Sequence, residues 1–214
     1  MPSENQTRTY KKFEAAVFRT TTGEFGALSN MAPDYPVVVN GVRIPTIEAL
    51  YQACRYPDFP EIQTVILDQM SPMTAKMKSK KYLAKTRGDW DGVRVSIMRW
   101  CLRTKLAQNW NKFGSVLRKT ADKPIVEEST KDEFWGAKPK NDGTLVGMNV
   151  LGRLLMELRQ EYREVESGQR NSIEFPKVSH FILLGRPLLE SNLNLHRLHE
   201  AQSAMFERRD TDGY

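Results

Sequence analysis

Residues 37–53 have the sequence VVVNGVRIPTIEALYQA, and this stretch decides the fold. Two runs rich in β-branched residues flank Asn40-Gly41, a pair that tolerates the positive φ angles of a two-residue hairpin turn. Thr46 then stands where its side chain can cap a helix that begins at Ile47. The stretch therefore predicts a β-hairpin that leads directly into a short helix.

Helical spacing of apolar residues dominates the rest of the chain. Pro72 after Ser71 is typical of a first helical turn, and the spacing of apolar residues after Asp91 is that of a long amphipathic helix. We also expect helices over 113–118 and 148–162, and strands over 17–21 and 124–127. The predicted fold class is α+β, a predominantly helical single domain with a small β-hairpin or sheet.

The expected organisation is one domain with extensions at both ends. Residues 1–12 are polar and predict a flexible lead-in, followed by a catalytic domain over 13–168. Residues 169–214 predict a C-terminal extension that packs on the domain, because about 45 residues alone make a marginal core.

Charge is concentrated in one part of the chain. The net charge is +6, and the segment 76–123 contains fourteen Lys and Arg against three acids. Such a block favours a polyanionic partner, a nucleotide or a nucleic-acid backbone, although a solvated helical face is an equally common explanation.

The expected compartment is the cytoplasm. Cys54 and Cys101 are too few for a disulfide framework and suit buried thiols in a reducing environment. No apolar leader or uncharged run of membrane-spanning length is present, so we expect no membrane association.

Four positions carry the candidate chemistry. Asp132 precedes the pair Trp135-Gly136, so a carboxylate lies near an aromatic face suited to a flat ring. Glu48 lies in the first turn of the predicted helix and could accept hydrogen bonds from ribose hydroxyls. Lys76 lies between Ala75 and Met77, where partial desolvation could make its amine a nucleophile. Each of these also has an ordinary structural explanation: a buried Trp, a helix-terminal charge or a solvated lysine.

Two further features concern ligands. Gly147 and Asn149 precede a helix, an arrangement that suits a backbone approaching phosphate. His196 and His199 lack an obvious third ligand, so we expect no metal and no cofactor.

Together these motifs resemble the NADAR family, also called YbiA-like, in order over roughly residues 18–163. The segments that carry the resemblance are 25–31, 40–53, 71–76, 87–90, 105–109, 117–122, 125–129, 132–136 and 147–152, with Met98. The chain departs from the family pattern at Arg55, where a lysine is usual, and at 77–81, where Lys80 or Lys81 would replace a family arginine.

The resemblance implies an N-glycosidase in which a lysine attacks the anomeric carbon to give a Schiff base. By position that lysine best matches Lys76, with Lys105 as the alternative, while Glu48 and Asp132 would hold ribose hydroxyls or relay protons. The substrate-binding residues implied are Asn30, Arg43, Lys80, Lys105, Trp90, Trp135, Gly136, Gly147 and Asn149.

Three hypotheses about function stay open. The first is removal of ADP-ribose from guanine bases in nucleic acid, with a cognate ADP-ribosyltransferase toxin as a further partner. The second is hydrolysis of early ribosylamino pyrimidine phosphate intermediates of riboflavin synthesis. The third is a non-catalytic module that binds ADP-ribose or NAD.

Overall fold

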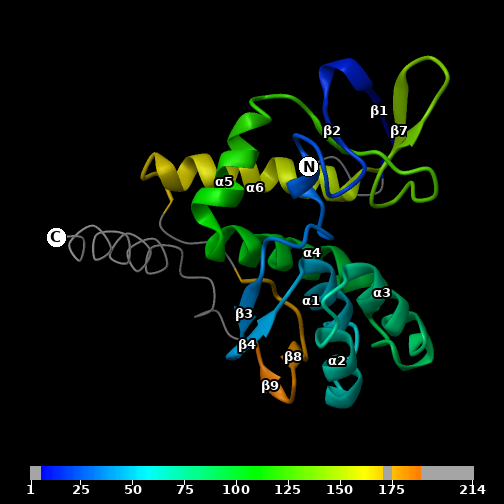
Figure 1. Cartoon of the computed structure of the whole chain (residues 1–214), viewed down its shortest axis with the longest axis vertical. Helices are drawn as coiled ribbons and strands as arrows, with labels where there is room; N and C mark the ends of the chain where they lie inside the picture. Colours follow the sequence, from blue (N-terminus) through cyan, green and yellow to red (C-terminus); the bar gives the residue numbers. More distant parts are fainter. Residues whose placement is uncertain (1–5, 171–174, 189–214) are drawn as a thin grey trace.

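Helix α4 (Trp90–Gln108) runs through the middle of the molecule, and the other elements lie on either side of it (Figure 1). The structure is a computed structural model that describes residues 6–170 and 175–188. Helices dominate and the sheets are small, so the fold class is α+β, as predicted.

One side of α4 carries the hairpin and three short helices. Strands β3 (Val37–Val39) and β4 (Val42–Ile44) pair in antiparallel fashion, with Asn40 and Gly41 both at positive φ in the turn. The Thr46 side chain accepts a hydrogen bond from the backbone N–H of Ala49, as the cap prediction required. The helices that follow are α1 (Ile47–Ala53), α2 (Pro60–Leu67) and α3 (Pro72–Lys80), the last capped by Ser71.

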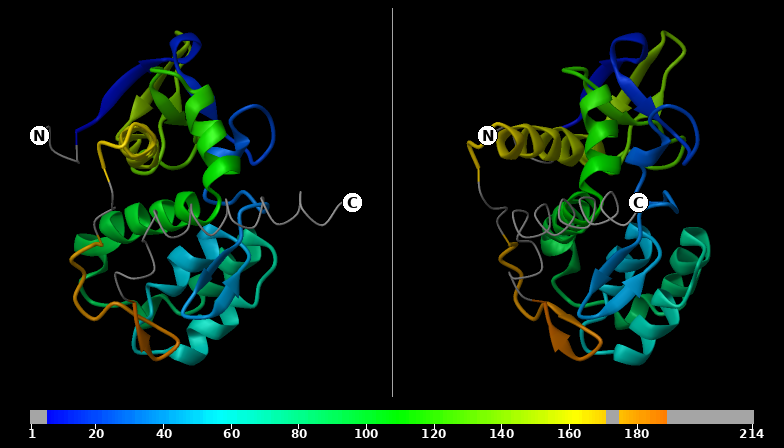
Figure 2. Two further views of the ribbon diagram at one scale, coloured as in Figure 1. Left: turned by 90° about the vertical axis from the view of Figure 1, so that its left-hand side faces the viewer. Right: turned by 60° about the vertical axis from the view of Figure 1, so that its left-hand side comes forward.

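The other side of α4 carries two longer helices and most strands (Figure 2). Helix α5 (Trp110–Lys119) follows α4, and α6 (Val150–Glu166) packs against both α4 and α5. Strand β2 (Ala16–Phe18) pairs in parallel with β5 (Ile125–Glu127). A separate antiparallel sheet has the order β1 (Arg8–Lys11), β7 (Thr144–Gly147), β6 (Lys138–Pro139).

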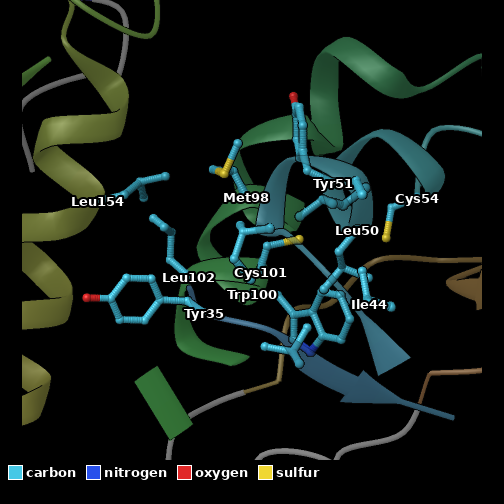
Figure 3. Packing of buried hydrophobic residues seen from close by; sticks show 14 of the residues in the cluster. Tyr35, Ile44, Leu50, Tyr51, Cys54, Met98, Trp100, Cys101, Leu102 and Leu154 are labelled. Atoms are coloured by element: carbon cyan, nitrogen blue, oxygen red, sulfur yellow. The ribbon is translucent and has the colours of Figure 1, made fainter. Parts of the chain in front are cut away.

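The main core forms where α4 meets α1 and the hairpin. Trp100 and Cys101 of α4 are fully buried and lie among side chains from β4 and α1, including Ile44 and Leu50 (Figure 3). Cys54 and Cys101 are both buried free thiols. This core fixes the position of α1, whose outer residues reach the candidate site.

The ends of the described chain are tied to the domain. Residues 8–11 form β1 and pair with β7, so the predicted flexible lead-in over 1–12 does not hold for them. Near the other end, β8 (Ile182–Leu183) and β9 (Arg186–Pro187) form a small hairpin beside α2. Phe181 packs edge-on against Trp100 with ring centroids 4.9 Å apart, so residues 175–188 pack on the core. The rest of the predicted extension, 189–214, lies outside the described residues.

Candidate active site

A cavity of about 280 Å³ opens between the helices α1, α3 and α4 and the strand end of β5 with the loop that follows it. Six side chains singled out from the sequence line it: Asn30, Glu48, Lys76, Trp90, Asp132 and Trp135. Glu127, Arg55 and Arg94 also line it and were not among the predicted site residues. The cavity therefore combines carboxylates, cations and aromatic rings.

Glu48 lies at the floor of the cavity and is only 2% exposed. The amide of Asn30 donates to one carboxyl oxygen, and Gln52 Nε2 donates to the other at 2.9 Å. Gln52 in turn accepts from Ser79 Oγ at 2.7 Å, which links α1 to α3. Burial raises the pKa of Glu48, while the charge of Lys76 and the hydrogen bond from Gln52 act against that rise. Glu48 is thus a fixed acceptor between two helices.

Lys76 reaches the cavity from the second turn of α3 and is half-buried. Its charge acts on both Glu48 and Glu127 and partly opposes the rise in pKa that burial causes in each carboxyl group. An amine held beside two carboxyl groups in a cavity can attack an electrophilic carbon and exchange protons with its neighbours.

Glu127, at the end of β5, has the most useful acid–base property in the cavity. Burial, with a smaller contribution from the neighbouring charge of Asp132, raises its pKa to about 7. A carboxyl group with a pKa near neutrality can both donate and accept a proton under physiological conditions. The sequence shows only a glutamate after a short apolar run, and its burial comes from segments distant in the chain.

Asp132 organises the loop that closes one side of the cavity. One of its carboxyl oxygens accepts from the backbone N–H groups of Phe134 and Trp135, both at 2.9 Å. Ser129 Oγ accepts from the backbone N–H of Asp132 at 3.0 Å. The carboxylate therefore fixes the position of Trp135 as well as lining the cavity.

Aromatic rings form another wall. Tyr51 packs edge-on against Trp135 with centroids 5.7 Å apart, and its ring is tilted against that of Trp90 with centroids 5.1 Å apart. The guanidinium of Arg55 lies over the Trp90 ring, 4.5 Å from its centroid. The predicted stacking of Trp135 on a ring and the predicted substrate-binding role of Trp90 are compatible with this placement and stay predictions.

Gly136, Gly147 and Asn149 do not line the cavity; they join β5, the 128–136 loop and α6. A Cβ at Gly136 would lie 2.6 Å from the carbonyl oxygen of Glu127, and one at Gly147 would lie 2.4 Å from that of Gly136. Asn149 adopts a left-handed conformation, accepts from the N–H of Glu127 at 3.0 Å and donates to Ile125 O at 2.8 Å.

The expected phosphate contact at the start of α6 is not available in this structure. The backbone N–H groups of residues 148–151 donate to the carbonyl oxygens of residues 133–136 at 2.7–3.0 Å. Because these donors are already satisfied, Gly147 and Asn149 serve the loop rather than a ligand.

Arg43 and Lys80 also lie away from the cavity, with exposed side chains on β4 and at the end of α3. Lys105 is fully buried on α4, where its Nζ donates to the carbonyl oxygens of Ala27 at 2.6 Å and Ser29 at 3.0 Å. Burial lowers the pKa of Lys105 well below its usual value. Its contacts are those of a structural lysine, and only Lys76 of the two candidate nucleophiles lines the cavity.

We expect Lys105→Met to destabilise the protein by about 2–3 kcal/mol, because two buried carbonyl oxygens lose their donor. Lys112 is a matched control: like Lys105, it lies over the Tyr35 ring and donates to a backbone carbonyl, but it does so at the surface. Lys112→Met should change the free energy of unfolding by less than about 0.5 kcal/mol. Urea unfolding followed by circular dichroism measures both, and equal effects would contradict a structural role for Lys105.

The basic block is largely engaged within the protein. Five of its fourteen cations form ion pairs with residues that the structure describes, and Lys105 and Lys112 donate to backbone carbonyls. The pairs are Arg87–Asp89, Arg94–Asp91, Arg99–Glu157, Arg103–Glu161 and Arg118–Glu166. Exposed Lys80, Lys81 and Lys85 remain near α3, so the cationic surface is smaller than the sequence count indicates.

Within the described ranges, no three His, Cys, Asp or Glu side chains gather in a group that could hold a metal ion. His196 and His199 lie outside those ranges. None of the helices in the described part of the chain has the length and apolar character needed to cross a membrane.

The chain is similar to known proteins over this whole region. A family model described as the NADAR domain matches residues 17–163. N-glycosidase YbiA of Escherichia coli (strain K12) is 33% identical over 144 residues, which cover 67% of this chain and 86% of that protein. A riboflavin biosynthesis protein of Vibrio vulnificus (strain YJ016) is 35% identical over 139 residues, 65% of this chain but only 36% of that protein.

The solved structures agree with this relationship. The NMR structure of the E. coli protein YbiA matches with a TM-score of 0.61 and 29% identity, covering 75% of this chain and 94% of that one. The fold, the lysine–carboxylate cavity and these relatives define a hydrolase of the glycosidase class. The chain belongs to the NADAR domain family.

Proposed function

We propose that this protein is an N-glycosidase that hydrolyses a small ribosylamino pyrimidine phosphate, an early intermediate of riboflavin synthesis. The observation that carries the proposal is the cavity in which Lys76 lies beside Glu48, Glu127 and Asp132. A nucleophilic amine, fixed acceptors and a carboxyl group able to donate a proton are the groups that cleavage of a C–N glycosidic bond requires.

In the proposed reaction, the lone pair of Lys76 Nζ forms a bond to the anomeric carbon as the C–N bond to the base breaks. The electron pair of that bond goes to the leaving nitrogen, which takes the proton of Glu127. The Glu127 carboxylate takes a proton from the lysine nitrogen and returns it to the ring oxygen as the ribose ring opens, which gives a protonated Schiff base. Water then adds to the imine carbon, releasing the sugar and restoring the amine.

Glu48 and Asp132 have positioning roles in this proposal. Glu48 accepts from Asn30 and Gln52 and has its carboxylate at the cavity floor, where a ribose hydroxyl would donate to it. Asp132 orders the loop through the N–H groups of Phe134 and Trp135. Trp135, which is only partly buried, would stack on the pyrimidine ring.

Two observations favour a small substrate. The cavity of about 280 Å³ is near the lower end of ligand pockets and suits one ribosyl unit with its base. Among the described residues, half of the fourteen cations that suggested a nucleic-acid partner form an ion pair or donate to a backbone carbonyl of the protein itself. Relatives named riboflavin biosynthesis proteins, in Vibrio vulnificus and in maize chloroplasts, point the same way.

The second candidate is removal of ADP-ribose from guanine in nucleic acid, which would make the protein an antidote to an ADP-ribosyltransferase toxin. One observation favours it: Lys80 and Lys81 are exposed at the end of the helix that carries Lys76, where a nucleic-acid backbone could bind.

Turnover of matched substrates by the full chain tests the choice. We expect kcat/KM for the ribosylamino pyrimidine phosphate to exceed that for an ADP-ribosylated oligonucleotide by roughly 100-fold. The reverse order would establish the second candidate, and binding of ADP-ribose without release of base from any substrate would establish a non-catalytic module. Lys80→Ala combined with Lys81→Ala is the control, since it should affect only the oligonucleotide reaction.

A further inference from the structure

Two arginines on the cavity wall have no role in the glycosidic cleavage described above. Arg55 follows α1 and Arg94 lies on α4, and both line the cavity. Arg55 lies over the Trp90 ring, and Arg94 lies over the Phe134 ring at 3.9 Å from its centroid. Stacking of this kind orients a guanidinium group but leaves its N–H edge free for an anion.

Each of these arginines has a hydrogen-bond donor that the described residues leave unused. Nε of Arg55 and Nε of Arg94 are both shielded from solvent, and neither has a hydrogen-bond acceptor among the described residues. Arg55 has no ion pair within residues 6–170 and 175–188, and Arg94 has only an ion pair of 3.5 Å with Asp91, whose side chain is 89% exposed. A shielded donor without an acceptor is costly, and charged donors cost more than neutral ones.

The two guanidinium groups act on the same part of the cavity. The hydroxyl of Tyr51 points away from the apolar core (Figure 3). Burial raises its pKa, and the charges of both Arg55 and Arg94 act against that rise. Arg55 also acts on Glu48, whereas the strongest neighbours of Glu127 are Asp132 and Lys76. The ring contacts give the same placement: Arg55 lies over Trp90, which packs against Tyr51 on one side, and Arg94 lies over Phe134, which reaches Tyr51 through Trp135 on the other.

We propose that Arg55 and Arg94, with Tyr51 between them, form a binding subsite for a phosphate monoester on the substrate. A small turn of each side chain would bring the Nε and Nη edge onto phosphate oxygens, where the fork of a guanidinium donates two parallel hydrogen bonds. The backbone N–H groups at the start of α6 are already satisfied, so the loop offers no competing phosphate contact there. The subsite rests on the proposed function in one respect, namely that the phosphate monoester is taken to belong to the glycosidase substrate.

Binding measurements that involve no bond cleavage test this subsite separately from the enzyme activity. Calorimetry on the full chain compares ribose 5-phosphate with ribose as probes. We expect ribose 5-phosphate to bind at least about 10-fold more tightly, and Arg55→Gln and Arg94→Gln each to remove most of that difference. Arg186→Gln, an exposed arginine on β9 outside the cavity, is the matched control and should keep the full preference.

Two outcomes would overturn the subsite. In the first, the unaltered chain binds ribose and ribose 5-phosphate equally; in the second, both glutamine variants keep the tighter binding of ribose 5-phosphate. Tighter, arginine-dependent binding of ADP-ribose would replace the monoester by a diphosphate. Arg55→Lys distinguishes loss of the subsite from misfolding. Lysine keeps the charge but cannot donate two parallel hydrogen bonds, so this variant should bind ribose 5-phosphate with part of the preference that Arg55→Gln loses. A phosphate preference without any glycosidase turnover would leave the subsite standing and refute the proposed reaction.

Discussion

Lys76→Ala is expected to lower turnover of the glycoside by at least about 1,000-fold, because no other lysine of residues 6–170 and 175–188 lines the cavity. Borohydride reduction during turnover should attach the sugar to one lysine peptide, the one that contains Lys76. Alanine is favourable within α3, so the variant should keep its fold and its binding of ribose 5-phosphate. Steady-state kinetics and mass spectrometry of the trapped protein provide the two measurements.

Lys78→Ala is the matched control for this experiment. Lys78 belongs to the same helix and is half-buried like Lys76, but it does not line the cavity. Its loss should leave kcat/KM within about twofold. Normal turnover by Lys76→Ala, with no labelled peptide, would remove the covalent step from the proposal.

Glu127→Gln is expected to lower kcat/KM by about 100- to 1,000-fold, since an amide cannot donate the proton that the leaving nitrogen needs. The pKa of Glu127 is about 7, and its carboxyl group is neutral below that pH. The rate that depends on the acid form should therefore fall as pH rises above about 7 in the unaltered protein. In the variant this descending limb should vanish from the pH profile.

The same pKa predicts how stability varies with pH. The folded protein holds the Glu127 proton more tightly than the unfolded chain, whose carboxyl has an ordinary pKa of 4.5. The stabilisation from this proton is complete below pH 4.5 and is lost as pH rises through about 7. Glu127→Gln should remove that slope from urea unfolding curves recorded across the range.

Glu128→Gln is the control for both measurements. This neighbouring side chain points away from the cavity and pairs with Lys12 at 2.6 Å and Arg19 at 3.8 Å. Its loss should leave the pH profile unchanged. If the two variants have the same profile, Glu127 is not the proton donor.

Elements with local signals could be predicted from the sequence. The Asn40-Gly41 turn, the Thr46 cap and the Ser71-Pro72 helix start all appear where their residues predict them. The sheet β1-β7-β6 was not predicted, because its pairing joins Arg8–Lys11 to Thr144–Gly147 and no local pattern specifies a partner so far along the chain. Polar residues in β1 also resemble a flexible terminus, and only the pairing orders them.

The candidate site shows the same division. Glu48, Lys76 and Asp132 lie around one cavity, as the family resemblance implied, although their roles stay predictions. Glu127 lay inside a recognised segment, but a raised pKa depends on burial by distant residues and cannot be read from a short motif. Asn149 and Gly147 matched a phosphate-binding pattern, yet the carbonyl oxygens of residues 133–136 occupy the neighbouring N–H groups. Such a contact depends on the path of a loop, which composition does not specify.

The parallel pairing of β2 with β5 has a consequence for the order of events during folding. Ala16 pairs with Ile125, so this contact encloses the hairpin and helices α1 to α5 in one long loop. Closing a loop of that length costs chain entropy, and the neighbouring α4 and α1 helices can form their turns long before the closure occurs. Glu127 is the last residue of β5, and it pairs with Phe18 of β2 only after this closure. Helical signal should therefore return earlier than catalytic competence when the denatured chain is refolded, and the interval between the two would time this single event.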